Sequence, residues 1–352
     1  MAYIQSIGTA KAKYPFLQKE TVHYMLAMYN APAEDIPKIH RLYENCKIEK
    51  RYSCIDEFQH EASTGFYKKN NMPDTNERMR AFFEHAPALA IEAIENCIQQ
   101  EDLNNITHLI TVSCTGLAAP GLDISIAHRL GLSTYIERTS VNFMGCYALL
   151  HALKMADAIC KANVSSKVLI ADVELCTLHF QDTYTLENVA SSLLFGDGAC
   201  ALLISNQKGL YELKESQSYL SYQGHQDMTW QLSNSGFQMS LSNLVPNLIA
   251  PCMEPAIEKL LSKTRFTKSD IVYWAIHPGG KKILSEIQKA ENLSDEDLKF
   301  SYQILNDYGN MSSVTIGFLL EEMHKKIEKE KLVFAAAFGP GLTIETYLLQ
   351  SC

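Results

Sequence analysis

The feature that most constrains the fold is an internal repeat, in which the same order of strands, glycine turns and helices occurs in each half of the chain. The first copy consists of "THLITVSCTG", "GLDISIAHRLGL", "FMGCYALLHALKMADA" and "SKVLIADVEL". The second consists of "DIVYWAIHPGG", "KKILSEIQKAENL", "YGNMSSVTIGFLLEEM" and "KLVFAAAFGPG". Apolar strands that alternate with apolar-periodic helices indicate an α/β layer structure, and the repetition predicts two halves of matching topology. We place these halves at residues 1–207 and 208–352.

The repeat places two polar residues at equivalent points, each near the start of a long apolar helix. Cys146 falls in the first turn of the helix in the first half, and Asn310 precedes the matching helix in the second half. His277 ends a strand of the second half. If the halves pack about a pseudo-two-fold axis, both helix N-termini face one central site. We therefore expect these three residues to meet.

Cysteine, histidine and asparagine suit acyl transfer through a covalent thioester. A helix N-terminus and a neighbouring imidazole both favour a thiolate, so we expect the Cys146 sulfur to be ionised at neutral pH as an ion pair with His277. His277 and Asn310 can also donate hydrogen bonds to an oxygen that becomes negatively charged. Hydrolysis fits less well, because we identify no Asp or Glu adjacent to this group to activate water. Taken singly, each residue also has a structural interpretation: a buried thiol, a strand cap and a turn residue.

Composition excludes several other functions. The chain has 352 residues and a net charge of −9, which gives no general affinity for nucleic acid or for an anionic membrane. It contains no apolar run long enough to span a bilayer and no signal-peptide core. Ten irregularly spaced cysteines indicate reduced thiols and a cytoplasmic location. We find no metal-ligand, nicotinamide or flavin motif, so no cofactor is expected.

The chain contains the five motifs "GCYALL", "LLFGDGA", "IHPGGKKIL", "YGNMSS" and "FGPGLTIET". Together they resemble the type III polyketide synthases, the chalcone-synthase-like branch of the thiolase superfamily, and the likeness covers nearly the whole chain. The resemblance implies a five-layered αβαβα sandwich, a homodimer, and malonyl-CoA and acyl-CoA as substrates. It also implies that Cys146 carries the acyl chain, while His277 and Asn310 assist decarboxylation and hold the thioester carbonyl.

The resemblance also assigns a substrate cavity. It implies that Phe195 is a gatekeeping aromatic residue, and it places Met239 where a second gatekeeping aromatic is usual. The remaining positions that match the cavity wall are Cys114, Cys176, His179, Trp230 and Ser312. Trp230 stands where plant enzymes carry glycine, so we expect it to fill cavity space and to shorten or redirect the growing chain. Cys114 is either a second reactive thiol or a small buried residue.

The segment "PKIHRLYENCKIEKRY" supplies basic side chains that could meet the phosphates of CoA. The resemblance matches Lys38 and Arg41 to phosphate-binding positions, but Asn45 replaces a third lysine, for which Lys47 or Lys282 could compensate. Lys50 and Arg51 belong to the same basic segment, and for Lys47 and Lys50 a solvated helix face is the alternative interpretation.

The chain resembles two groups of bacterial enzymes, and the two resemblances predict different products. Cys114 and Cys176 resemble tetrahydroxynaphthalene and phloroglucinol synthases, which favours malonyl-CoA as sole substrate. "TNERMRAFFEHAPALAIEA" and "NFMGCYALL" resemble alkylresorcinol and alkylpyrone synthases, which favours an aliphatic acyl-CoA starter extended by two or three malonyl units. The aliphatic starter is our preferred hypothesis. A carrier-protein-dependent β-ketoacyl synthase and a catalytically idle thiolase-fold partner are the alternatives outside this group.

Overall fold

The structure is a computed structural model that describes residues 1–59 and 65–352. The strands are β1 (Tyr3–Lys11), β2 (Tyr14–Leu17), β3 (Lys50–Ser53), β4 (His108–Ser113), β5 (Glu137–Asn142), β6 (Val168–Leu175), β7 (Asp197–Ser205), β8 (Tyr211–Leu220), β9 (Met228–Ser233), β10 (Gly236–Leu241), β11 (Ile271–Ile276), β12 (Leu332–Gly339) and β13 (Thr343–Ser351). The α-helices are α1 (Gln18–Met28), α2 (Ile36–Asn45), α3 (Thr75–Cys97), α4 (Leu122–Leu130), α5 (Ala148–Ala162), α6 (Leu186–Leu194), α7 (Val245–Leu261), α8 (Lys281–Glu291), α9 (Lys299–Tyr308) and α10 (Val314–His324).

Within the described residues, the main sheet has nine strands in the order β11-β12-β13-β8-β1-β7-β6-β4-β5. Strands β1, β7, β6, β4 and β5 come from the first half of the chain, and β8, β13, β12 and β11 from the second. The two groups meet through a short antiparallel pairing in which Tyr3 and Ile4 face Glu212 and Tyr211. Each half therefore forms its own sheet, and the two sheets are joined along one edge.

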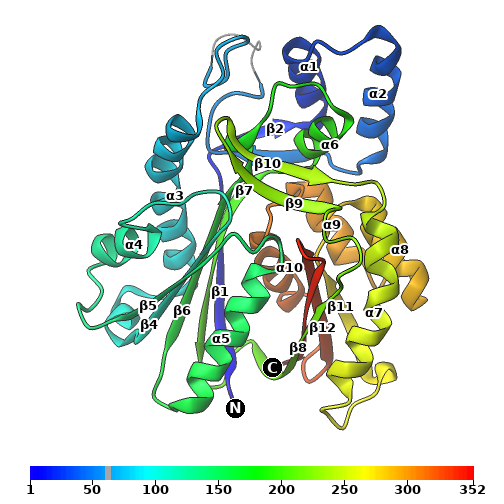
Figure 1. Cartoon of the computed structure of the whole chain (residues 1–352). Helices are drawn as coiled ribbons and strands as arrows, with labels where there is room; N and C mark the ends of the chain where they lie inside the picture. Colours follow the sequence, from blue (N-terminus) through cyan, green and yellow to red (C-terminus); the bar gives the residue numbers. More distant parts are fainter. Residues whose placement is uncertain (60–64) are drawn as a thin grey trace.

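Three buried apolar clusters show how the layers are stacked. One cluster packs α3 against the outer face of the first-half sheet. The second encloses α5 and α10 between the inner faces of both sheets, and the third packs α7 and α8 against the outer face of the second-half sheet. Figure 1 shows these layers side by side, with the rest of the helices around them. The predicted five-layered αβαβα sandwich is confirmed.

The central helix α10 lies against both sheets, which explains why its sequence is apolar on every side. All of its residues from Val314 to Leu320 are buried. Gly317 allows this packing, because a Cβ atom there would lie 2.4 Å from the sulfur of Cys200 on β7. A helix that is hydrophobic all round is expected where two sheets cover it.

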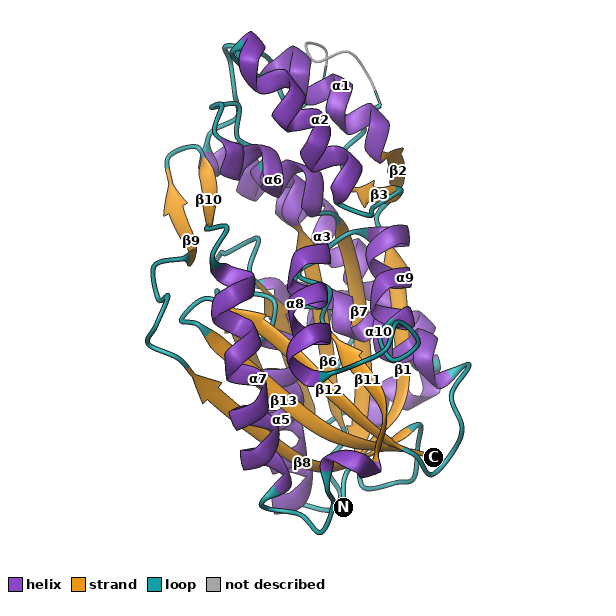
Figure 2. Ribbon diagram, turned by 90° about the vertical axis from the view of Figure 1, so that its right-hand side faces the viewer, coloured by secondary structure: helices purple, strands orange, loops and turns teal. Residues whose placement is uncertain are grey.

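The elements predicted from the repeat are present. Ile271–Ile276 forms β11 as expected, and β4, β6, β12, α4, α8 and α10 occupy the predicted segments within a few residues. Additional elements, α1, α2, α6, the β2–β3 ribbon and the β9–β10 hairpin, lie together at one end of the sandwich, whereas both termini lie at the opposite end (Figures 1 and 2). Among the described helices, none combines the length and apolarity needed to cross a bilayer.

Candidate active site

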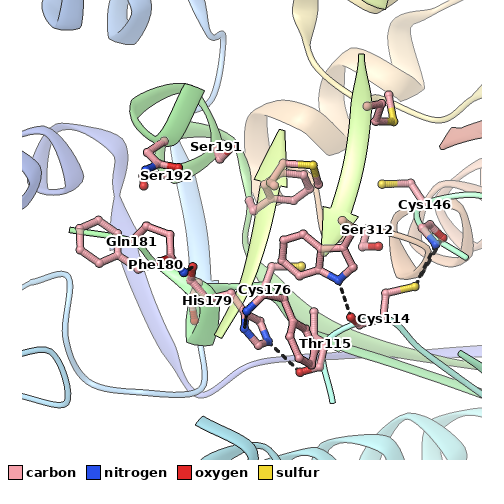
Figure 3. Close-up of a pocket in the computed structure, with 18 of the residues that line it drawn as sticks. Cys114, Thr115, Cys146, Cys176, His179, Phe180, Gln181, Ser191, Ser192 and Ser312 are labelled. Atoms are coloured by element: carbon pink, nitrogen blue, oxygen red, sulfur yellow. Dashed lines mark hydrogen bonds between the residues drawn. The ribbon is translucent and has the colours of Figure 1, made fainter. Parts of the chain in front are cut away.

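A cavity lies at the end of the sandwich that α6 and the β9–β10 hairpin cover. Its wall contains most of the residues that the sequence assigned to it: Cys146, Phe195, Cys114, Cys176, His179, Trp230, Met239 and Ser312. Figure 3 shows Cys114 and Cys146 toward one end of this cavity and Phe180, Gln181, Ser191 and Ser192 toward the other. The cavity therefore extends from the predicted nucleophile to the polar side of α6.

Cys146 lies in a turn that leads into α5. The helix begins at Ala148, so the expectation that Cys146 belongs to the first helical turn is wrong by two residues. The turn depends on Gly145, whose φ of 89° is unfavourable for other residues and whose missing side chain leaves room for the ring of Pro340. The Gly145 N–H donates to the Cys114 sulfur over 3.0 Å, which ties this turn to the end of β4.

Asn310 reaches the same point from the second half of the chain. Its side-chain Oδ1 lies 4.0 Å from the Cys146 sulfur and accepts a hydrogen bond from the Ser312 N–H over 2.8 Å. Because the Ser312 N–H fixes the position of Asn310 Oδ1, the Nδ2 hydrogens of Asn310 point away from Ser312 and are available to donate to another group. The predicted meeting of Cys146 and Asn310 is thus present in the structure.

His277 directly follows β11, and its N–H donates to the Ala336 carbonyl of β12 over 2.8 Å. The side chain is 1% exposed, and neither ring nitrogen has a hydrogen-bond partner among the described residues. The following loop approaches the end of α6, since a Cβ atom on Gly280 would lie 3.8 Å from Leu194. His277 itself is not part of the cavity wall. A buried imidazole with no partner is costly, so its two nitrogens are available to a reacting group.

Burial controls the charge of the two groups. It raises the pKa of Cys146 to about 12; the negative charge of Glu174 adds to this, while hydrogen bonds from Ser312 and Asn310 act against it. Burial also lowers the pKa of His277 to about 3. In this geometry the thiol and the imidazole are both neutral at pH 7, which differs from the ion pair expected from the sequence. Formation of that ion pair stays a prediction.

A buried pair of acids, Asp172 and Glu174, lies close enough to Cys146 for the charge of Glu174 to raise the pKa of its thiol, so the interpretation that no carboxyl group adjoins this site is wrong. Glu174 accepts hydrogen bonds from the Cys114 N–H over 3.0 Å and from the Thr115 hydroxyl over 2.8 Å. The Ser313 hydroxyl lies 3.0 Å from both Glu174 Oε1 and Asp172 Oδ1. Burial raises the pKa of both acids. The signal in the sequence is two acidic residues at alternate positions of the otherwise apolar strand "VLIADVEL".

Trp230 forms one side of the cavity and is held rigidly. Its Nε1–H donates to the Cys114 carbonyl over 2.7 Å, and its ring meets those of His179 and Phe237 edge to face. A tryptophan held in this way takes up space on the cavity wall, and its predicted effect on the growing chain stays a prediction.

His179 is a neutral wall residue. Its Nε2–H donates to the Thr115 carbonyl over 2.8 Å (Figure 3), and its Nδ1 accepts the Phe237 N–H over 3.0 Å. Its ring stacks on that of Phe237 at 4.3 Å, and burial lowers its pKa to about 3. Because both nitrogens are occupied, His179 cannot act as a proton acceptor without losing a structural hydrogen bond.

The other cavity thiols are also neutral. Burial raises the pKa of Cys114 and of Cys176 well above the ordinary thiol value. Of the two interpretations of Cys114, the small buried residue fits this environment better than the reactive thiol. All ten cysteines lie in the described residues, and none is in a disulfide.

The expected CoA-binding residues lie outside the cavity. Lys38, Arg41 and Asn45 are exposed on one face of α2, which packs against α6. Lys38 pairs with Asp35 at 2.5 Å, and the distant Lys282 donates to the Asn243 carbonyl over 3.2 Å. The structure therefore places α2 beside α6, which lines the cavity, with Lys38 and Arg41 on the exposed surface of α2.

Arg51 does not belong to that exposed basic surface, although the sequence groups it with the neighbouring lysines. Its side chain is 1% exposed, lines the cavity and donates hydrogen bonds to backbone carbonyls. The sequence gives no signal for this burial, because one charged residue in a basic segment looks like its neighbours.

Two models of one protein family together match nearly the whole chain. The model of the N-terminal domain of chalcone and stilbene synthases matches residues 1–208, and that of the C-terminal domain matches residues 212–352. The chain is 30% identical to the α-pyrone synthesis polyketide synthase-like Pks18 of Mycobacterium tuberculosis, over 99% of the chain and 91% of the relative. It is 28% identical to the probable polyketide synthase 1 of Dictyostelium discoideum over 99% of the chain, which spans 11% of that longer protein.

A solved structure is also similar over its whole length. The C-terminal type III polyketide synthase domain of Steely1, from Dictyostelium, has a TM-score of 0.92 and 27% sequence identity. The similarity covers 99% of each chain.

Proposed function

Because this chain belongs to the chalcone and stilbene synthase family and is a type III polyketide synthase, we propose that Cys146 is its acyl-carrying nucleophile and that His277 and Asn310 assist it. The observation that carries this proposal is the convergence of Cys146 and Asn310, from opposite halves of the chain, with 4.0 Å between Sγ and Oδ1 where Cys146 lines the cavity.

The acyl chain enters as a CoA thioester, and the Cys146 sulfur attacks its carbonyl carbon and releases the CoA thiol. Transfer of the thiol proton to His277 would give the nucleophile its charge and would give the buried imidazole a partner. The departing CoA thiolate takes up that proton from His277, which leaves a neutral imidazole with one N–H. Malonyl-CoA then binds with its thioester oxygen toward the Asn310 Nδ2 hydrogens and this N–H, and these donors stabilise the enolate that loss of CO2 creates. The enolate carbon attacks the acyl-cysteine carbonyl and the C–S bond breaks, so the lengthened chain stays on CoA and the Cys146 thiolate is released.

The substrates fit the surface around the cavity. CoA carries phosphate groups, and Lys38 and Arg41 present positive charge on α2, which packs against the α6 wall of the cavity. We propose that this face of α2 holds the nucleotide end of CoA while the acyl end passes α6 toward Cys146. No cofactor besides these CoA substrates is part of the proposal.

For the starter, we propose an aliphatic acyl-CoA that is extended by two or three malonyl-CoA units and released as an alkylpyrone or alkylresorcinol. The apolar residues Phe195, Met228 and Met239 on the cavity wall support an aliphatic chain, and Trp230 limits its extension. The α-pyrone synthesis named for the mycobacterial relative supports the same class of product. Malonyl-CoA as sole substrate, giving a phloroglucinol or tetrahydroxynaphthalene product, is the alternative.

The test is mass spectrometry of products formed by the purified protein from malonyl-CoA with a panel of acyl-CoA starters. We expect pyrones or resorcinols that contain the starter, together with CO2 release, and we expect no product from Cys146→Ala. Product from malonyl-CoA alone at an equal rate would favour the alternative. Strict dependence on acyl-carrier protein would favour a β-ketoacyl synthase, and lack of any turnover would favour an idle binding partner.

We also propose that the protein is a homodimer in the cytoplasm. Strand β5 is at the edge of the main sheet, and all its residues except Val141 are exposed. Leu117 and Ile124 nearby are each about two-fifths exposed (41% and 42%), which adds apolar area to this surface. An open edge strand with apolar neighbours is a suitable surface for a second copy. Light scattering of the purified protein tests this proposal.

A further inference from the structure

Arg51 on β3 is a buried arginine that forms no ion pair with a carboxylate among the described residues, although the charge of Asp197 acts on it. Its Nε–H donates to Gln18 Oε1 over 3.0 Å, and its Nη2–H donates to the Thr21 hydroxyl over 2.9 Å. Its Nη1–H groups donate to two carbonyls at the end of α6, those of Ser192 over 2.7 Å and Phe195 over 2.5 Å. Burying an arginine is costly, so these bonds point to a specific role.

The bonds of Arg51 belong to a complete set that satisfies the C-terminal end of α6. The last carbonyls of a helix have no partner within the helix. Here Ser192 O is bound by Arg51, Leu193 O by the Gln18 amide over 2.6 Å, and Leu194 O by the Asn310 N–H over 3.0 Å. The guanidinium charge also lies at the negative end of the helix dipole. Arg51 and Gln18 therefore fix the position at which α6 ends.

The end of α6 in turn fixes Asn310. The Asn310 N–H donates to the Leu194 carbonyl, and the Asn310 carbonyl accepts the Gly196 N–H over 2.9 Å, so Phe195 and Asn310 pair as in a short parallel bridge. Arg51 also contacts this second segment directly, because a Cβ atom on Gly309 would lie 2.7 Å from Arg51 Cδ. One buried side chain thus contacts both the cavity residue Phe195 and the backbone before Asn310.

We propose that Arg51 is a positioning residue, which holds Phe195 and the Asn310 amide in register with the Cys146 sulfur by bridging the end of α6. This inference rests on the proposed role of Asn310 in decarboxylation. Arginine is required because its planar group binds several carbonyls at fixed angles, whereas a lysine ammonium cannot hold Ser192, Phe195, Gln18 and Thr21 together.

The experiment compares Arg51→Lys with Arg78→Lys. Arg78 on α3 is a matched control, since it is fully buried and donates to three backbone carbonyls, those of Pro73 over 3.0 Å and of Leu178 and Phe180 over 2.8 Å each. Its described hydrogen bonds do not involve α6 or Asn310. The readouts are the release of CO2 from malonyl-CoA, the KM for malonyl-CoA, alkylation of Cys146 by iodoacetamide, and thermal unfolding. Asn310→Ala is measured beside them.

We expect Arg51→Lys to lower the kcat for decarboxylation about tenfold or more, with a change in KM below about threefold, because a displaced donor acts mainly in the transition state. Alkylation of Cys146 should stay within about twofold of the wild-type rate, and Arg78→Lys should keep a kcat within about twofold. If Arg51→Lys does not fold, Gln18→Met replaces it in the test. This substitution removes the acceptor of the Arg51 Nε–H and should also lower the kcat for decarboxylation.

Two results would overturn the inference: a folded Arg51→Lys or Gln18→Met protein with wild-type kcat, or an equal loss of kcat in Arg78→Lys. A different result would contradict the proposed function: release of CO2 by Asn310→Ala at the wild-type rate. If Asn310→Ala is impaired and Arg51→Lys is not, only the positioning role of Arg51 is lost.

Discussion

The charge of Cys146 is the property of this site that is easiest to measure. Replacing His277 with Gln keeps a polar side chain of similar size but removes the group that can accept the thiol proton. Only the thiolate reacts with iodoacetamide, so the alkylation rate reports the ionised fraction of Cys146. At the pKa of about 12 that burial imposes, about one molecule in 10⁵ carries a thiolate at pH 7.

An ion pair with His277 has to offset the free energy that ionising the buried Cys146 thiol requires at pH 7. Holding the thiolate at pH 7 against a pKa about five units higher requires about 7 kcal/mol. If His277 supplies this stabilisation, the wild-type alkylation rate at pH 7 should exceed that of His277→Gln by up to about 10⁵-fold. In His277→Gln the raised thiol pKa keeps alkylation of Cys146 slow at neutral pH, and the alkylation rate rises about tenfold for each pH unit. The ratio of the wild-type rate to the His277→Gln rate should therefore fall to about 10² near pH 10.

The assay follows the Cys146 peptide by mass spectrometry from pH 7 to pH 10, with Cys146→Ala as the background for the other cysteines and circular dichroism as the folding control. A wild-type rate that is already high at pH 7 and changes little above it supports the ion pair. Equal rates in the two proteins, both rising tenfold per pH unit, would show that His277 does not ionise Cys146 and would refute the reasoning.

Three further predictions concern the cavity, the CoA surface and the turn. Trp230→Gly removes a fixed ring from the wall, so products should gain at least one more malonyl unit, as mass spectrometry of the product mixture would show. Arg41→Glu on the exposed face of α2 should raise the KM for malonyl-CoA about tenfold at low salt and change kcat little, and an unchanged KM would exclude this face from CoA binding. Gly145→Ala forces a side chain into a φ of 89° and to 2.5 Å from the Pro340 ring, so urea unfolding should show a loss of about 2 kcal/mol or more. Gly131→Ala, also at positive φ but with open space around it, should cost only about 1 kcal/mol, and equal losses would mean that the Pro340 contact is unimportant.

Much of the candidate site was predictable because its residues occupy equivalent places in a repeat. Cys146 and Asn310 each precede a central helix, and apolar periodicity is a local property that reveals such helices and strands. The cavity residues Phe195, Trp230 and Met239 were assigned through motifs, and all three line the cavity. The positions of these site residues along the chain could therefore be predicted from the sequence alone.

The environment of each side chain was not accessible in this way. Glu174 lies on β6 and reaches the site only because β4 and β6 are neighbours in the sheet, which brings the Cys114 N–H to its carboxyl group. Arg51 is grouped with exposed lysines in the sequence, yet pairing of β2 with β3 and packing against α6 bury it completely. Both cases depend on contacts between segments more than fifty residues apart.

The order of residues along the chain was enough to predict the layered α/β architecture and the approach of Cys146 to Asn310, because apolar periodicity and motifs are local properties. The folded chain was needed to show that burial raises the pKa of the Cys146 thiol and lowers that of His277, that the charge of Glu174 acts on Cys146, and that Arg51 donates to the end of α6. The physical reason is that desolvation and hydrogen-bond partners are set by neighbours in space, which the fold brings together from distant parts of the chain.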